Sequence, residues 1–259
     1  MTTAEVRQNF LIGELFQPCR VQMVYTDLDR LVIGGIMPGS EIELPAYPEL
    51  RSEYFTERRE VGIINLGDAG EIAVGGQVFP LEHLECLYIG QGEPDIVFRN
   101  SPGGQAAFYL LSAPAHRKFP TTRATLADAS VQELGTAERA SRRKLVQYIH
   151  EGGIQSCQLV MGYTKLEPGS VWNTWPPHTH RRRSEIYLYF ELGAQSVMHF
   201  LGEPNASRHV VVRDREAVLS PPWSIHTGVG TGAYSFVWGM AGENRSFADM
   251  DPVELARFA

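Results

Sequence analysis

The segment EVGIINLGDAGEIAVGGQVFPL (60–81) places short apolar runs between turns rich in glycine and aspartate. Short runs of Val, Ile and Phe separated by such turns are typical of neighbouring antiparallel strands. The same pattern recurs in the first half of the chain in RVQMVYTD (20–27), RLVIGGI (30–36), CLYIGQG (86–92), DIVFRN (95–100) and AAFYLLSA (106–113). Turn signals spaced by roughly 8–12 residues favour a β-sandwich or barrel.

A second series of the same kind begins near residue 154 and ends with AYSFVWGM (233–240). The segment between the two series has prolines, threonines and charges without sustained alternation, which predicts a connector. Its end, TAERASRRKLVQYIH (136–150), fits either a capped helix or a strand, and we prefer a strand from about 143. The tail DPVELARFA (251–259) predicts one short helix. We therefore expect an all-β chain with little helix. Its expected parts are an N-terminal domain (1–115), a connector (116–142) and a C-terminal domain (143–259).

Composition narrows the classes of function. The chain has 259 residues, 43% of them hydrophobic and 20% charged, which is typical of a folded protein. Its net charge is −7 and its longest basic run is Arg181–Arg183, so nucleic acid is not an expected partner. No apolar run is long enough to cross a bilayer, and the amino terminus lacks a signal-peptide pattern, which together predict a cytoplasmic protein.

The three cysteines, Cys19, Cys86 and Cys157, stand far apart and are odd in number. This pattern fits neither a disulfide framework nor a thiolate zinc site. We expect them to be small apolar core residues.

The stretch PHTHRRRSE (177–185) holds two histidines and a carboxylate. Alternate residues of a strand share one face, so His178 and His180 would stand about 6.6 Å apart along the backbone, close enough to chelate one ion. Glu185 opens the β-like run EIYLYF, and a neighbouring antiparallel strand would bring its carboxylate to the same face.

A fourth ligand is available in SPPWSIHTGVG (220–230), where His226 follows a proline pair. Three imidazoles and one carboxylate suit Zn, Mn, Fe, Co or Ni, whereas Ca and Mg prefer oxygen ligands. The alternative is a solvated surface turn that binds nothing.

These residues resemble a known metal motif. The order Gly169, then His-x-His-x4-Glu, then a distal His after a proline-containing turn resembles the cupins, whose fold is a small jelly roll or double-stranded β-helix. Longer segments are similar to the family of 4-deoxy-L-threo-5-hexosulose-uronate ketol-isomerases (5-keto-4-deoxyuronate isomerases) of pectin degradation. They are LEPGSVWNTWPPHTHRRRSEIYLYF (166–190), RHVVVRDREAVLSPPWSIHTGVGTGAYSFVWGMAGENRSFADMD (208–251), DRLVIGGIMP (29–38), REVGIINLGDAG (59–70) and SAPAHRKFPT (112–121).

The resemblance implies two cupin-like jelly-roll domains, assembly into hexamers, and one zinc ion held by His178, His180, Glu185 and His226. The implied reaction converts 5-dehydro-4-deoxy-D-glucuronate to 3-deoxy-D-glycero-2,5-hexodiulosonate. This is an aldose–ketose exchange at the end of the sugar remote from its carboxylate. A metal that contacts both reacting oxygens would stabilise the developing negative charge, so no nucleophile is required.

The remaining roles are hypotheses. Metal-bound water or Glu185 would assist the proton transfer, and Tyr187, on the same strand face as Glu185, would relay the proton. The alternative for Tyr187 is a core aromatic. Arg182 and Arg183 are candidates for binding the substrate carboxylate, the alternative being a solvated face or a subunit contact.

Two other functions fit the same ligands. One is an oxygenase in which they hold Fe or Mn with open positions for O₂. The other is a non-catalytic sugar-binding cupin in which a metal braces the barrel.

Overall fold

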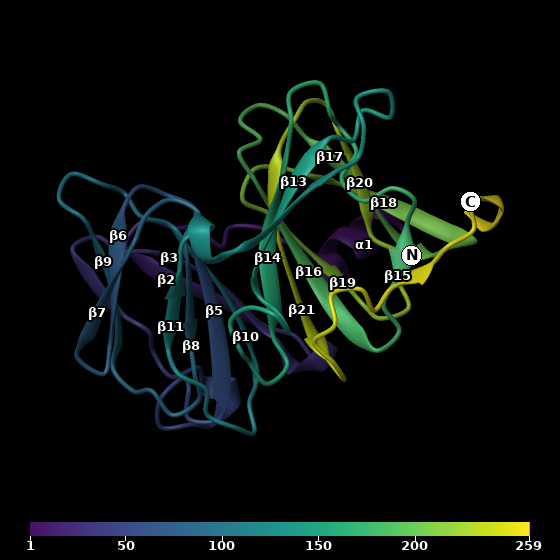
Figure 1. The fold of residues 1–259 in the computed structure, drawn as a ribbon. Coiled ribbons are helices and arrows are strands. Elements are labelled where there is room, and N and C mark those ends of the chain that lie inside the picture. The colour runs from purple at the N-terminus through teal and green to yellow at the C-terminus, as the bar shows by residue number, and fades with distance from the viewer. Residues whose placement is uncertain (259) are drawn as a thin grey trace. The chain divides into compact units, whose positions relative to one another are not determined.

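The structure is a computed structural model that describes residues 1–258 (Figure 1). Packing divides the chain into two compact units. Unit 1 comprises Met1–Gly13, Ser130–Gln147 and Met161–Ala259, and unit 2 comprises Glu14–Ala129 and Tyr148–Val160. The named strands of both units pair antiparallel, and α1 is the one α-helix among the described residues, so the predicted all-β class is confirmed.

Unit 2 is built from two sheets. The six-stranded sheet has the order β11-β8-β5-β10-β3-β2 and the four-stranded sheet has the order β4-β9-β6-β7. Their bounds are β2 (Arg20–Tyr25), β3 (Val32–Met37), β4 (Glu41–Glu43), β5 (Arg59–Asn65), β6 (Gly70–Val74), β7 (Gln77–Leu81), β8 (Cys86–Ile89), β9 (Ile96–Asn100), β10 (Phe108–Pro114) and β11 (Thr122–Ala124). Short 3₁₀ turns lie at Leu28–Arg30, Pro48–Leu50 and Leu126–Asp128.

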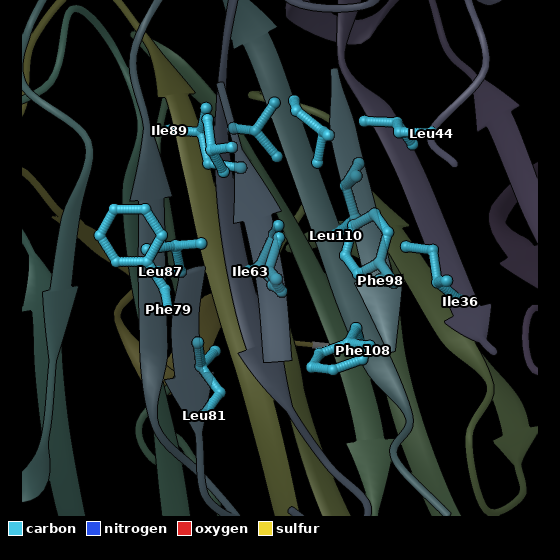
Figure 2. Packing of buried hydrophobic residues seen from close by; sticks show 14 of the residues in the cluster. Ile36, Leu44, Ile63, Phe79, Leu81, Leu87, Ile89, Phe98, Phe108 and Leu110 are labelled. Carbon is cyan, nitrogen blue, oxygen red and sulfur yellow. The ribbon is translucent and has the colours of Figure 1, made fainter. Parts of the chain in front are cut away.

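The core of unit 2 draws side chains from both of its sheets. Ile63 on β5 and Leu110 on β10 are paired in register, and they belong to one buried cluster with Phe98 of the other sheet (Figure 2). The rings of Phe98 and Phe108 lie 5.2 Å apart. Burying each such side chain contributes roughly 1.5–3 kcal/mol, so the short apolar runs of 60–81 stabilise a core between two packed sheets.

Unit 1 carries a seven-stranded sheet with the order β1-β19-β16-β21-β14-β13-β12, a three-stranded sheet β18-β17-β20 and a small pair β15-β22. Their bounds are β1 (Leu11–Ile12), β12 (Ser130–Leu134), β13 (Arg143–Ile149), β14 (Val160–Leu166), β15 (His178–Thr179), β16 (Arg183–Phe190), β17 (Val197–Glu203), β18 (Ala206–Val212), β19 (Ala217–Ser220), β20 (Thr227–Gly230), β21 (Ser235–Gly242) and β22 (Asp251–Pro252). The helix α1 (Thr3–Phe10), capped by Thr2, contacts β18 and β19.

Several local expectations can now be compared with the structure. The strand expected from about 143 is confirmed as β13, and the tail forms a 3₁₀ turn at Leu255–Arg257. The segment 116–142, expected as a connector, contains β11 and β12, which pair with β8 and β13. The strand β12 has no buried residue, and its sequence accordingly lacks the apolar alternation that marks a half-buried strand. This is why the sequence did not predict it. The domain limits at 115 and 143 stay a prediction.

The cysteines were only partly predicted. Cys86 is buried, whereas Cys157 is half-buried and Cys19 is exposed, so the expectation of a core residue is wrong for Cys19. Among residues 1–258, no helix is long and apolar enough to span a bilayer.

Candidate metal centre

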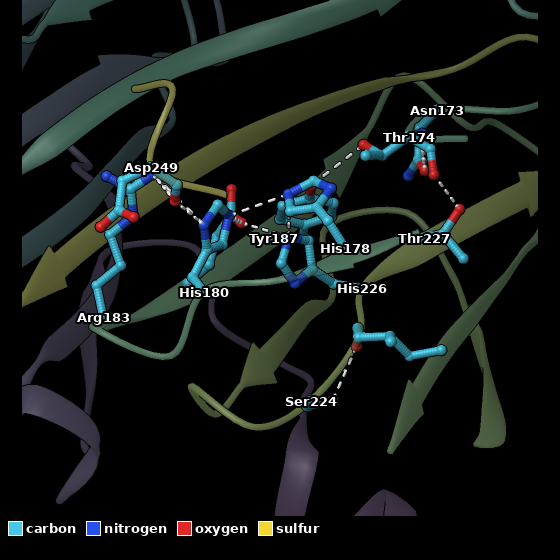
Figure 3. A network of polar contacts seen from close by, with 12 residues as sticks. Asn173, Thr174, His178, His180, Arg183, Tyr187, Ser224, His226, Thr227 and Asp249 are labelled. Atoms are coloured by element: carbon cyan, nitrogen blue, oxygen red, sulfur yellow. Dashed lines mark hydrogen bonds and ion pairs between the residues drawn. The ribbon is translucent and has the colours of Figure 1, made fainter. Parts of the chain in front are cut away.

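Three histidines and one glutamate of unit 1 meet at one point. Figure 3 shows His178, His180 and His226 turned toward one another. The Nε2 atom of His178 lies 3.1 Å from that of His180 and 3.0 Å from that of His226. Glu185 Oε2 lies 3.1 Å from His180 Nε2 and 2.8 Å from His226 Nε2. One ligand atom from each residue thus lies within 4.8 Å of all the others.

The strands that position these ligands differ from the expected arrangement. We expected both histidines on one strand beside the strand of Glu185. Instead β15 ends at Thr179 and pairs with β22, while His180 lies in the turn that leads into β16. Glu185 is the third residue of β16, and His226 immediately precedes β20. The four residues grouped from the sequence do lie together, but the sequence did not reveal that β22 pairs with the strand of His178.

The donor set fits a divalent transition metal. All four residues are buried, and ligand atoms about 2 Å from a shared ion stand about 3 Å from one another. Burial, followed by repulsion from the neighbouring imidazoles, lowers the pKa of His178 well below its ordinary value. Burial also lowers the pKa of His226. Neutral imidazoles and an ionised carboxylate are the forms that bind a metal.

Glu185 is held ionised. Burial alone would raise its pKa, but the neighbouring imidazoles of His226 and His180 more than offset burial, so the pKa lies below its ordinary value.

A backbone carbonyl orients one ligand ring. His180 Nδ1 lies 2.7 Å from the carbonyl oxygen of Asp249, to which it donates its proton, so its Nε2 keeps a free lone pair for a metal. The same carbonyl accepts a hydrogen bond of 3.0 Å from Arg183 Nη2. Arg183 also donates to the carbonyls of Ser246 and Phe247. The buried guanidinium of Arg183 therefore holds the segment that positions His180.

The two arginines proposed for the substrate carboxylate are engaged elsewhere. Arg182 Nε donates to Asp249 Oδ1 at 2.7 Å, and its Nη2 lies 3.0 Å from Asp251 Oδ1. Arg183 donates to the carbonyls just described. Neither is among the described residues that line the cavity beside the ligands. The Arg183 guanidinium lies 3.4 Å from His180 Nδ1, on the side of that ring away from Nε2, while Arg182 is paired with the two aspartates.

A cavity of about 140 Å³ adjoins the ligands. His178, His180 and Glu185 line it together with Tyr187, as the shared strand face of Glu185 and Tyr187 predicted. The Tyr187 hydroxyl lies 3.3 Å from Thr174 Oγ1. Burial and the charge of Glu185 raise the pKa of Tyr187 well above its ordinary value, so it stays protonated at neutral pH.

Sequence reasoning missed the rest of the lining. Apolar walls come from β21 and the segment after it, and the polar groups outside the metal motif belong to Arg143, Thr164 and Thr174. Arg143 is the first residue of β13, the strand expected from about residue 143. The signal that could have found it is the alternation of Arg143 and Leu145, which both line the cavity.

His199 makes stability depend on pH. Its ring is fully buried, and its Nδ1 accepts a hydrogen bond of 2.6 Å from the Tyr189 hydroxyl. Burial and the charge of His226 lower its pKa to about 3. The unfolded chain binds this proton near pH 6.5, so the free energy of unfolding should fall as the pH drops from about 6.5 to about 3, by roughly 4–5 kcal/mol. Denaturant unfolding at a series of pH values measures this slope.

Replacing His199 by Phe should reduce that pH dependence and leave the part due to the lowered pKa values of His178 and His226, whereas replacing the exposed His209 by Gln should leave it as in the unsubstituted chain. Equal slopes in the His199→Phe variant and the unsubstituted chain would contradict this assignment.

The fold and the ligand set together define a cupin-type protein. An IolB-like protein of Salmonella typhimurium LT2 superposes with a TM-score of 0.75 at 12% identity, covering 95% of this chain and 97% of that one. Oxalate decarboxylase of Bacillus subtilis, a protein with Mn(II) centres, superposes with a TM-score of 0.65 at 11% identity, covering 94% and 79% of the two chains. These likenesses establish the fold.

The chain belongs to the KduI/IolB family, whose model matches residues 15–256. It is 54% identical over 254 residues to the 4-deoxy-L-threo-5-hexosulose-uronate ketol-isomerase of Opitutus terrae, covering 97% of this chain and 92% of the relative. It is 52% identical to the enzyme of the same name from Kineococcus radiotolerans, covering 99% and 94%.

Proposed function

We propose that this chain is a metal-dependent ketol-isomerase that converts 5-dehydro-4-deoxy-D-glucuronate to 3-deoxy-D-glycero-2,5-hexodiulosonate. The observation that carries the proposal is the convergence of three imidazoles and one carboxylate at the wall of a cavity of about 140 Å³. Its substrate is taken from the two relatives, which share about half of their residues with this chain over nearly its full length.

The reaction moves one proton between adjacent carbons and one between their oxygens. When bound, a divalent metal supplies Lewis acidity that stabilises negative charge on the two reacting oxygens. The chain's own groups must then move the protons. Glu185 is ionised and lines the cavity, so it is the candidate base for the carbon-bound proton.

Tyr187 takes the complementary role. Its hydroxyl is protonated at neutral pH and lines the same cavity as Glu185. An O–H group in this state donates a hydrogen bond to a substrate oxygen and returns a proton to it. The apolar walls keep bulk water from the reacting carbons and so strengthen both interactions.

Replacing Tyr187 by Phe should lower turnover about 100-fold, the usual scale of one acid–base group, with metal content unchanged. Initial rates and metal analysis measure both quantities. The control is Tyr189→Phe, because Tyr189 lies on the same strand but bonds to His199 and is absent from the described cavity lining. Its turnover should change only a few-fold. If the Tyr187→Phe enzyme turned over at the normal rate, the proposed role in proton transfer would be wrong, and Tyr187 would be only a core aromatic.

The proposed function is tested by supplying the keto-uronate and following its carbonyl and proton signals by NMR, with and without a chelator. Loss of the aldehyde signal, dependent on metal and without oxygen consumption, is the expected result. Oxygen uptake would favour an oxygenase, and binding without interconversion would favour a sugar-binding cupin.

Finer features predicted from the resemblance remain proposals. They are zinc as the native metal, assembly into hexamers, a cytoplasmic location and a place in pectin breakdown. The ligand set supports a transition metal of this group without selecting zinc.

A further inference from the structure

We propose that Arg143 binds the carboxylate of the substrate at the end of the cavity opposite the metal ligands. This inference rests on the proposed function, because a keto-uronate carries its carboxylate at the end remote from the carbons that isomerise. It replaces the expectation for Arg182 and Arg183.

The charge of Arg143 supports this role. Arg143 is half-buried and lines the cavity, and its Nη1 donates to the carbonyl of Ser141 at 2.9 Å. Within residues 1–258 no carboxylate pairs with it. The titratable groups that act on it are the hydroxyls of Tyr187 and Tyr234, which are neutral at neutral pH, and burial lowers the pKa of Arg143 from its ordinary value. A partly desolvated cation without a counter-ion, facing a cavity, favours an anionic ligand.

The place of Arg143 in the sheet also supports this role. Glu185 and Tyr187 lie on β16, and in the sheet order β21 and β14 separate that strand from β13, where Arg143 lies. Neighbouring strands stand about 4.8 Å apart, so the three spacings from β16 to β13 place these two backbones about 14 Å apart along the sheet. The side chains reach inward from there and shorten the distance. An arginine side chain on one side and the metal ligands on the other leave room between them for a six-carbon sugar acid.

An aromatic wall lies between these ends. Trp238 and Phe236, both on β21, line the cavity. Their apolar rings exclude water and leave recognition of the charged groups to the two ends. The cavity thus offers candidate metal ligands at one end, an aromatic wall in the middle and a guanidinium at the other end.

The chemistry of the ligand follows from these groups. A guanidinium presents two parallel N–H donors, which match the two oxygens of a carboxylate. Binding the carboxylate there places the aldehyde end at the metal ligands. Arg143 would therefore fix the direction in which the substrate enters, and neutral sugars of the same length would bind weakly.

The test compares Arg143→Met with Arg142→Met. Methionine keeps the length and apolar stem of Arg143 but removes the charge. Arg142 is the exposed neighbour, paired with Glu167 at 3.3 Å, and serves as the matched control. We expect Arg143→Met to raise KM for the keto-uronate about 100-fold while metal content is unchanged, since a charge-assisted hydrogen bond to a partly buried group contributes on that scale. Arg142→Met should keep KM within about twofold.

Two further measurements exclude a merely structural role. Arg143→Lys should recover only part of the affinity that Arg143→Met loses. Lysine keeps the positive charge, but it lacks the two parallel N–H donors of the guanidinium. Added methylguanidinium should lower KM of an Arg143→Ala variant and leave the unsubstituted chain unaffected. A KM within twofold of normal in Arg143→Met, with metal bound and the fold intact, would overturn the proposal.

Direct titration of the keto-uronate separates this inference from the proposed function. If the unsubstituted chain binds the keto-uronate without isomerising it and Arg143→Met loses that binding, the isomerase proposal fails while the role of Arg143 stands. If both proteins bind it equally, the role of Arg143 fails whatever the turnover.

Discussion

Replacing His226 by Gln is expected to remove the metal and to lower isomerase turnover by at least about 1,000-fold. His226 is buried, and its Nε2 lies within 3.0 Å of both His178 Nε2 and Glu185 Oε2. Without it, three ligand atoms remain and the affinity for a metal falls steeply. Loss of Lewis-acid stabilisation worth several kcal/mol corresponds to a rate loss of this size. Metal analysis of the purified variant and NMR turnover measure the two effects.

The matched control for this prediction is His209→Gln, the same change at an exposed histidine. It should retain both metal and turnover. A chelator should reproduce the His226→Gln loss in the unsubstituted chain, and added divalent metal should reverse it. Undiminished isomerisation by fully metal-free protein would end the proposal of a metal-dependent enzyme.

The Glu185→Gln enzyme should lose turnover by about 100- to 10,000-fold while it retains part of its metal. Glutamine has the same shape and keeps one oxygen that can face the metal, but it cannot accept the carbon-bound proton. The change therefore separates ligation from proton transfer better than a truncation would. Single-turnover rates should be normalised to bound metal.

Solvent deuterium gives a second readout for the same variant. If Glu185 is the base, exchange of the transferred proton with solvent should slow together with turnover in Glu185→Gln. A near-normal rate per bound metal would show that Glu185 is a ligand alone, and the base would then have to be sought among the other groups of the cavity.

The cluster of candidate ligands could be predicted from the sequence because most of its members are close together in the chain. His178, His180 and Glu185 fall within eight positions, and the buried cluster has the membership that the spacing suggested, with His226 as the fourth residue. Alternation along β16 likewise placed Tyr187 on the face of Glu185. The fold class followed from apolar alternation broken by turns.

The end of the cavity at Arg143 could not be predicted from the sequence, for a physical reason. Arg143 reaches the site through the order of strands in a sheet, and a single sequence does not contain that order. Arg182 and Arg183 show the converse, because they adjoin the motif in sequence and yet do not line the cavity. Their partners, Asp249, Asp251 and the carbonyls of residues 246, 247 and 249, lie far along the chain.

The pairing of β15 with β22 ties the candidate metal centre to residues far along the chain. All four candidate ligands lie at or before residue 226, yet the carbonyl that orients His180 belongs to Asp249, and the strand that pairs with β15 begins at Asp251. A fragment that stops between residues 226 and 249 would contain every candidate ligand and lack both supports. We expect such a fragment to bind a metal more weakly than the full chain, because nothing would hold its imidazoles in place.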